Sequence, residues 1–353
     1  MRQALALTAA AGIFVVCAAA QTTEPKTAEE VYKNIQELKG TPADQLVPAM
    51  QFISASLGVE CGFCHVQGKM DADDKPEKKT ARQMMAMTAM INKESFRGQR
   101  QVTCYSCHHG SSHPTNTPPV QESDTATHES HPPVAAGTVP NPDEIVAKYI
   151  AAVGADAINK VNSRVEKGSL IVGGNQVPIE IYTKAPNKRI SVAHMGTGES
   201  ITAFDGTAGW LGTPNGARAM SAAESEAAGL DAEFALPLRL KEMFPQLRRG
   251  RPEEINGVEC QTLTGIRQGH PPVRLYFDEK SGLLVRMVRY TDTPMGRNPT
   301  QIDYADYRDV DGVKIPFRWT LARPNGRFTI QIAEAKDNVP IEDSKFVKPA
   351  EGK

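Results

Sequence analysis

The chain has 353 residues, of which 40% are hydrophobic, and its 40 basic side chains nearly balance 41 acidic ones. This length is sufficient for two domains of ordinary size. The formal net charge of -1 excludes a general attraction to nucleic acid or to an anionic membrane surface. We therefore expect no nucleic-acid partner, and any other partner must be recognised locally.

The first segment, residues 1–20, places an apolar run after one basic residue and ends in three alanines. This pattern predicts a secretory signal peptide that is cleaved after Ala20. An uncleaved anchor is one alternative, and lipidation of Cys17 is another, although Val16 stands where a lipidation motif prefers a small residue. No later segment is apolar enough to cross a bilayer. We expect a periplasmic or otherwise exported protein, soluble or peripherally attached to a membrane.

Four of the six cysteines lie in two copies of Cys-x-x-Cys-His, CGFCH at 61–65 and CYSCH at 104–108. In an exported chain this pentapeptide is typical of c-type haem attachment. Two thiols on one turn of helix match the separation of the porphyrin vinyl groups, and the next His reaches the iron. Zinc binding or disulfides are alternatives, but they leave both histidines unexplained. The sequence predicts two haem c groups, attached through Cys61, Cys64, Cys104 and Cys107, with His65 and His108 as proximal ligands.

Methionines on helical patterns precede both motifs. The first pattern starts at Thr41 or near Asp44, carries Met50 and ends at Gly58. The second is expected to begin at Thr80 as its N-cap. It carries Met84, Met85, Met87 and Met90. Because methionine-rich stripes are more often core packing than iron ligands, at most one of these four is expected to bind iron.

Residues from about 30 to 112 resemble the haem-binding repeat of the photosynthetic reaction-centre cytochrome c subunit. The resemblance rests on PAMQFISASLGVECGFCHV, DDKPEKKTARQMMAMTAMIN and VTCYSCHHG. That family carries four haems in two such pairs, and this chain matches one pair. The loop KESFRGQRQ before the second motif has no His, so the His-ligated haem of full-length members has no equivalent here.

The resemblance also implies the distal iron ligands. It places Met50 opposite His65 on the first haem and Met84 opposite His108 on the second, with Met87 as the next candidate. The mixed-charge run Asp71–Lys79, between the two motifs, is expected to be a solvated loop, with a docking patch as the alternative.

Residues 113–140 are rich in Pro, Ser and Thr and show no periodicity, which predicts a linker. Its histidines, His113, His128 and His131, are expected to be polar spacers rather than metal ligands. After the linker, a single helix is predicted over Pro142–Val161 with Asn141 as its cap.

Short alternating runs then predict an antiparallel sheet, with hairpin turns at 279–282 and 310–312 and a helical insert near 221–244. The segments FDEKSGLLVRMVRY and YADYRDVDGVKIPFRW resemble the periplasmic lipoprotein-sorting (LolA-like) half-barrel. That resemblance implies a lipid or acylated ligand. Cys260, Trp210 and Trp319 are expected in the core.

The predicted fold class is multidomain. A small all-α cytochrome c domain (21–112) is followed by the linker and an antiparallel β-rich, half-barrel-like α+β domain (141–353). The expected function is electron transfer between a donor and an acceptor redox protein, one of them a membrane-bound photosynthetic or respiratory complex, without enzyme activity. Two alternatives stay open: a lipid- or lipoprotein-binding half-barrel with haems as redox input, and a haem enzyme or sensor with an open iron site.

Overall fold

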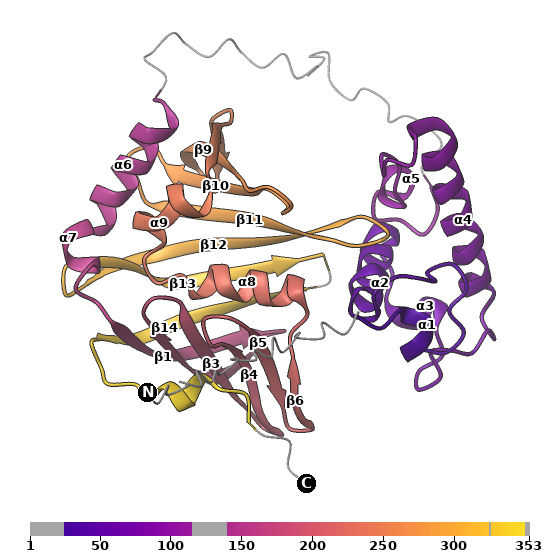
Figure 1. Ribbon diagram of the computed structural model, residues 1–353, viewed down its shortest axis with the longest axis horizontal. Coiled ribbons are helices and arrows are strands. Elements are labelled where there is room, and N and C mark those ends of the chain that lie inside the picture. Colours follow the sequence, from indigo (N-terminus) through magenta and orange to yellow (C-terminus); the bar gives the residue numbers. More distant parts are fainter. Residues whose placement is uncertain (1–24, 115–139, 325, 350–353) are drawn as a thin grey trace, which may run out of the picture.

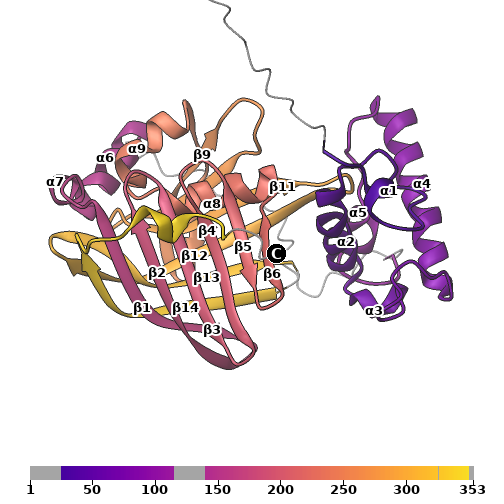
Figure 2. The ribbon, with the colours of Figure 1, turned by 60° about the horizontal axis from the view of Figure 1, so that its bottom comes forward.

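The computed structural model describes residues 25–114, 140–324 and 326–349. These fall into a helical region (25–114) and a sheet region (140–349), which lie side by side in Figures 1 and 2. The predictions for residues 1–20, Cys17, His128, His131 and most of the linker lie outside the described residues.

The helical region contains five helices within its described residues, and two of them are long. They are α1 (Ala28–Val31), α2 (Ala43–Leu57), α3 (Cys61–Cys64), α4 (Pro76–Phe96) and α5 (Tyr105–His108). Helix α2 ends as predicted, because Gly58 adopts the left-handed conformation at φ 64° that a helix C-cap favours. Helix α4 begins at Pro76 and not at Thr80, because proline suits the first helical position.

The mixed-charge run is more ordered than a solvated loop. Asp73 accepts hydrogen bonds from Asn34 Nδ2 and Arg82 Nη1, both at 2.9 Å, and its carboxylate lies 3.2 Å from Lys78 Nζ. Lys78 is only 8% exposed. The run therefore ties the start of α4 to the segment after α1, and the expectation of a solvated loop is wrong at this end.

The sheet region contains one 14-stranded antiparallel sheet in the described residues, with the order β6-β5-β4-β3-β2-β1-β14-β13-β12-β11-β10-β9-β7 and β8 paired to β9. Consecutive strands are mostly neighbours, as expected for a meander. The strands are β1 (Ser163–Val172), β2 (Asn175–Lys184), β3 (Lys188–Met195), β4 (Gly198–Phe204), β5 (Gly209–Thr213), β6 (Gly216–Ala219), β7 (Gln246–Arg249), β8 (Glu253–Ile255), β9 (Val258–Ile266), β10 (Val273–Asp278), β11 (Leu284–Asp292), β12 (Arg297–Val310), β13 (Val313–Arg323) and β14 (Gly326–Asp337). Both predicted hairpin turns are confirmed, between β10 and β11 and between β12 and β13.

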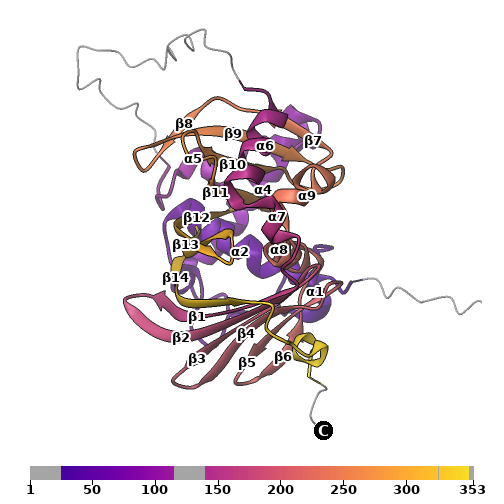
Figure 3. The ribbon, with the colours of Figure 1, turned by 90° about the vertical axis from the view of Figure 1, so that its left-hand side faces the viewer.

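Helices cover one face of this curved sheet (Figure 3). They are α6 (Pro142–Val153), α7 (Ala155–Ile158), α8 (Ala222–Ala232) and α9 (Leu236–Met243), and a short 3₁₀ helix, η1 (Asp343–Phe346), follows the last strand. The cap of α6 is confirmed, since Asn141 Oδ1 accepts a hydrogen bond from Glu144 N at 2.9 Å. The helical insert near 221–244 is confirmed by α8 and α9.

The single helix predicted over Pro142–Val161 is wrong. Helix α6 ends at Gly154, whose φ is 95°, and the short helix α7 begins at the next residue. A Cβ on Gly154 would lie 2.2 Å from the carbonyl oxygen of Gly312, so the turn also brings two backbones together.

The main core lies between α6, α7, α9 and the sheet. Its buried side chains include Tyr149, Ile181, Leu240, Leu275 and Phe277. Burying a large apolar side chain contributes about 1.5–3 kcal/mol, so this contact anchors the helices on the sheet. Cys260 is fully buried and Trp210 is 4% exposed, as predicted for core residues.

The hairpin of β11 and β12 extends beyond the rest of the sheet toward the helical region, as Figures 1 and 2 both show. Its tip, Thr293–Gly296, lies against α2, and Met295 belongs to the buried cluster of the helical region. Among the described residues, no helix has the length and apolar character needed to cross a membrane.

Candidate functional site: the two Cys-x-x-Cys-His motifs

The two motifs share a helical turn through their cysteines but differ at the histidine, since His65 is the extended C-cap of α3 and His108 is the last residue of α5. Each pair of cysteines spans one helical turn, in α3 and in α5 with the residue before it. The backbone N–H of His65 donates to the carbonyl of Cys61 at 3.0 Å, and that of His108 donates to Cys104 at the same distance. One turn of helix therefore brings each thiol pair to the same side as the following histidine.

Each histidine ring has its Nδ1 atom next to a backbone carbonyl. His65 Nδ1 lies 2.8 Å from the carbonyl oxygen of Met70, and His108 Nδ1 lies 2.9 Å from that of Ser111. Because a carbonyl only accepts hydrogen bonds, Nδ1 is the donor in each contact, which leaves Nε2 as the ring nitrogen available to a metal. This is the ring state that a metal-ligating histidine requires, and a haem iron fits it.

The pKa of two motif thiols is raised, unlike that of a reactive redox pair. The five cysteines in the described part of the chain form no disulfide. Burial raises the pKa of the Cys64 and Cys104 thiols, whereas reactive Cys-x-x-Cys pairs have a lowered thiol pKa. Nowhere in the described ranges do three or more His, Cys, Asp or Glu side chains gather as metal ligands. The raised thiol pKa values thus differ from those of a reactive Cys-x-x-Cys pair.

The two motifs are held together through the end of α2. The N–H of Gly110, just after the second motif, donates to Ser56 O at 2.9 Å. A Cβ on Gly58 would lie 2.0 Å from the carbonyl oxygen of Gly110, so only glycine allows this approach. The first motif is fixed to the start of α4, because Lys75 Nζ donates to the carbonyl of Gly62.

Asn92 orders the loop before the second motif, a role that no sequence signal indicated. Its side chain is 7% exposed and donates to Val102 O at 2.7 Å. Its Oδ1 accepts from the N–H groups of Gln101 and Val102, both at 2.9 Å. An asparagine inside a helical pattern is usually read as a surface residue, so only the fold reveals this role.

The methionines of α4 are not its core. The buried residues of this helix are Lys78, Thr88 and Asn92, all polar. Met87 and Met90 are 39% and 58% exposed, and Met84 and Met85 are half-buried. Core packing is therefore the wrong expectation for Met87 and Met90, whereas Met85 packs against a buried cluster.

Met50 and Met85 share one apolar cluster with the second motif. Together with Cys104, they pack against buried side chains of α1, α2 and the hairpin tip, including Ala49, Ile53 and Met295. Met84, the ligand that the resemblance implies, immediately precedes Met85. Met50 on α2 and Met85 on α4 thus both lie near the second motif.

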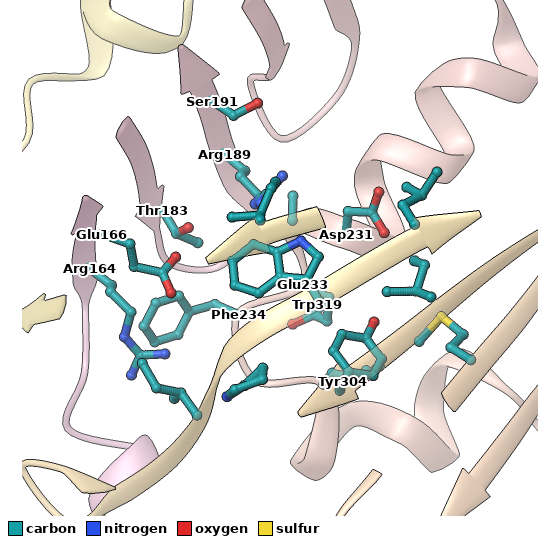
Figure 4. Close-up of a pocket in the computed structure, with 18 of the residues that line it drawn as sticks. Arg164, Glu166, Thr183, Arg189, Ser191, Asp231, Glu233, Phe234, Tyr304 and Trp319 are labelled. Carbon is teal, nitrogen blue, oxygen red and sulfur yellow. The ribbon is translucent and has the colours of Figure 1, made fainter. Parts of the chain in front are cut away.

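A second candidate site is a cavity of about 470 Å³ in the sheet region, between the sheet and helices α6 and α8. Its wall is mostly apolar and includes Leu230, Phe234, Tyr304 and Trp319 (Figure 4). Trp319 is only half-buried and lines this space, which differs from the expected core position.

Glu166 is the unusual polar group of the cavity. Its side chain, 8% exposed, has no hydrogen bond or ion pair within the described ranges, and Figure 4 shows it facing the cavity. Burial raises the pKa of this carboxyl, against the opposing effect of Arg164 and Arg189. Arg164 itself is engaged by Asp337, with Nε–Oδ1 at 2.6 Å.

Residues 2–194 match the family model of the photosynthetic reaction centre cytochrome c subunit. The chain belongs to this family. The match includes both Cys-x-x-Cys-His motifs and extends into the first strands of the sheet region. Membership implies covalently bound haem c, which agrees with the thiol pairs and the histidine ring state described above.

Two curated relatives match part of this family member. The photosynthetic reaction center cytochrome c subunit of Thermochromatium tepidum is 33% identical over 96 residues, which is 26% of this chain and 24% of the relative. Cytochrome c-554 of Chloroflexus aurantiacus is 33% identical over 82 residues, covering 21% and 20% of the two chains. The alignments span about a quarter or less of these relatives.

Solved structures match the sheet region of this family member. A putative outer membrane lipoprotein-sorting protein domain from Vibrio parahaemolyticus has a TM-score of 0.40 at 12% identity, covering 57% of this chain and 97% of that one. A LolA superfamily protein from Nitrosomonas europaea has a TM-score of 0.41 at 13% identity, covering 60% and 99%.

Proposed function

We propose that this protein is an exported dihaem c-type cytochrome that carries electrons and is not an enzyme. Cys61 and Cys64 attach the first haem, and Cys104 and Cys107 attach the second. The proposed domains are a signal peptide (1–20), a dihaem domain (21–112), a linker (113–140) and a half-barrel domain (141–353). The observation that carries the proposal is the shared geometry of His65 and His108, whose Nδ1 atoms donate to backbone carbonyls.

Each residue of the motifs has a definite task. When bound, haem c supplies reversible one-electron exchange. The carbonyls of Met70 and Ser111 hold the Nδ1–H groups of His65 and His108, so that each Nε2 would be the atom that ligates the iron. The thiols fix the edge of the porphyrin, so the histidine does not have to hold the cofactor alone.

We assign Met50 and Met84 as the distal ligands. A thioether in the sixth position raises the reduction potential, and it leaves no open coordination site for a substrate or a gas. This ligation separates a carrier from a haem enzyme or sensor. The half-buried state of both side chains on α2 and α4 is compatible with it.

The proposed partners are a donor and an acceptor redox protein, one of them a membrane-bound photosynthetic or respiratory complex. Family membership supports this class of partner. The proposed location is the periplasm or an equivalent compartment, with the protein soluble or peripherally attached to a membrane.

The haem count is tested by mass spectrometry of protein made in a host with haem-attachment machinery. We expect the denatured chain to retain the mass of two haems, and Cys61→Ala/Cys64→Ala to retain one. Cys260→Ala is the matched control and should retain both, because this thiol is buried in the sheet region. A single haem in the unmodified protein, or haem that dissociates on denaturation, would contradict the proposal.

A second function is favoured by the cavity of the sheet region. Its volume of about 470 Å³ and its mostly apolar wall suit the acyl part of a lipid or acylated ligand. The two tryptophans provide the test, since Trp319 lines the cavity and Trp210 is buried elsewhere. Adding a long-chain fatty acid should change the emission of Trp210→Phe, which retains Trp319, and not that of Trp319→Phe. An equal change in both variants would argue against the cavity as the binding site.

A further inference from the structure

The tip of the β11–β12 hairpin is buried, although hairpin tips are normally at the surface. Thr293 is 2% exposed and Met295 is 8% exposed. The burial comes from the helical region, because Met295 belongs to the same cluster as Leu46, Ala49 and Ile53 of α2.

The tip is a rigid turn. Thr293 N donates to Gly296 O at 2.8 Å, and the Thr293 hydroxyl donates to the same oxygen at 2.7 Å. That hydroxyl also accepts from Gly296 N at 3.1 Å. Because these bonds close the turn on itself, the position of Met295 follows the position of the strands.

Polar contacts on both sides of Met295 fix the hairpin to the helical region. Asn298 Nδ2, on β12, donates to the carbonyl of Pro48 in α2 at 3.0 Å. The guanidinium of Arg100, in the loop before the second motif, donates to the carbonyl of Thr293. The tip therefore contacts both the helix that carries Met50 and the loop that leads to Cys104.

The approach to α2 is close enough to require glycine in the tip. A Cβ on Gly296 would lie 2.2 Å from Cζ of Phe52. Pro48 and Phe52, the α2 residues in these contacts, flank Met50 by two residues on either side. A distal ligand on this helix is thus held between two points of contact with the hairpin.

We propose that the hairpin tip Thr293–Gly296 is a clamp that keeps α2, and with it Met50, in position on the haem of the first motif. Met295 and Asn298 are then positioning residues, which act on the iron through α2 and do not touch it. The inference rests on the proposed ligation of that haem by Met50. It gives the sheet region a part in the redox chemistry of the helical region.

The clamp is tested in the full-length holoprotein with Met295→Ala, and Met195→Ala is the matched control, because Met195 is a partly exposed methionine at the end of β3. One readout is amide hydrogen exchange of α2, which measures how firmly the helix is held. The other is the fraction of ferrous haem that binds carbon monoxide, which requires the methionine to leave the iron. We expect Met295→Ala to raise the exchange rate of the α2 amides and the fraction of haem that binds carbon monoxide, each by about tenfold, which is equivalent to about 1.4 kcal/mol. Met195→Ala should change neither the exchange rate nor the bound fraction.

A double-mutant cycle tests the contact itself. Gly296→Ala should loosen α2 through its collision with Phe52, and Phe52→Ala makes room for the added methyl group. If the clamp is correct, the double variant should change the exchange of α2 by less than the sum of the changes in the two single variants. Additive effects would overturn the assigned contact.

Failure of the clamp is distinguishable from failure of the proposed function. Unchanged α2 exchange and unchanged carbon monoxide binding in a folded Met295→Ala protein would overturn the clamp. Rapid carbon monoxide binding by both haems of the unmodified protein would instead contradict methionine ligation, and thus the carrier function.

Discussion

At the scale of single residues, the distal ligands determine the redox behaviour. We predict that Met50→His lowers the potential of one haem and that Met84→His lowers that of the other, because imidazole stabilises the ferric state relative to a thioether. Met85→His is the matched control, since Met85 is the adjacent half-buried methionine on α4. Spectroelectrochemical titration of each variant resolves the two haems.

Several outcomes would change this assignment. A lowered potential in Met85→His, together with an unchanged one in Met84→His, would move the second ligand by one residue. A lowered potential in a Met87→His variant would instead assign the second ligand to Met87, which is 39% exposed.

Asp73 is predicted to make the helical region acid-sensitive. Its hydrogen bond with Asn34 and its contacts with Lys78 and Arg82 lower the pKa of this carboxyl from 3.8 to about 2, against the opposing effect of burial. Because the folded pKa is depressed, this stabilisation is fully present above the unfolded pKa and is lost as the pH falls toward the folded value. Thermal melting between about pH 5 and pH 2 should therefore fall less steeply for Asp73→Asn than for the unmodified protein. Parallel melting curves would contradict this role of Asp73.

At the scale of elements, the contact between the end of α2 and the second motif is tested at Gly58. Gly58→Ala adds a Cβ 2.0 Å from Gly110 O at a residue with φ +64°. Gly68→Ala is a matched control, because Gly68 has φ +77° but no atom within 4 Å of the added Cβ. In both variants, placing alanine at a positive φ lowers the free energy of unfolding by about 1 kcal/mol. We expect Gly58→Ala to lower it by about 2 kcal/mol more, as measured by denaturant unfolding. Equal losses would show that the backbone approach contributes nothing.

Local signals predicted the elements that local physics determines. Gly58 marked the end of α2, and Asn141 followed by Pro142 marked the start of α6, because a helix cap needs only neighbours in the chain. The Cys-x-x-Cys spacing likewise predicted that each thiol pair lies on one helical turn.

Contacts distant in sequence could not be predicted in this way. The break at Gly154 is explained by the backbone of Gly312, and the burial of Met295 is explained by α2. The cavity and its buried Glu166 depend on strands from both halves of the sheet. A pattern of alternating residues shows which face of a strand is buried, but it does not show what covers that face.

At the scale of the whole molecule, the helical region should depend on the sheet region for part of its stability. A fragment of residues 21–115 is predicted to bind both haems and to cycle between ferric and ferrous forms. It should unfold more easily than the same region in the full chain by about 2 kcal/mol, the contribution of burying one methionine.

Chemical denaturation followed by haem absorbance measures this difference. Full-length Met295→Ala is the reference variant, and the stability of its helical region should be closer to that of the fragment than to that of the unmodified protein. A fragment as stable as the full chain would mean that the hairpin contributes no stabilisation.

The position of the hairpin in the chain also orders events in time. Synthesis proceeds from the N-terminus, so both Cys-x-x-Cys-His motifs are made before Thr293–Gly296. Under the proposed haem attachment at Cys104, this thiol exists during an interval in which no hairpin can yet pack on its cluster. The order of the sequence alone thus makes the hairpin contact the last to form, after the segments that we propose to bind haem have been made.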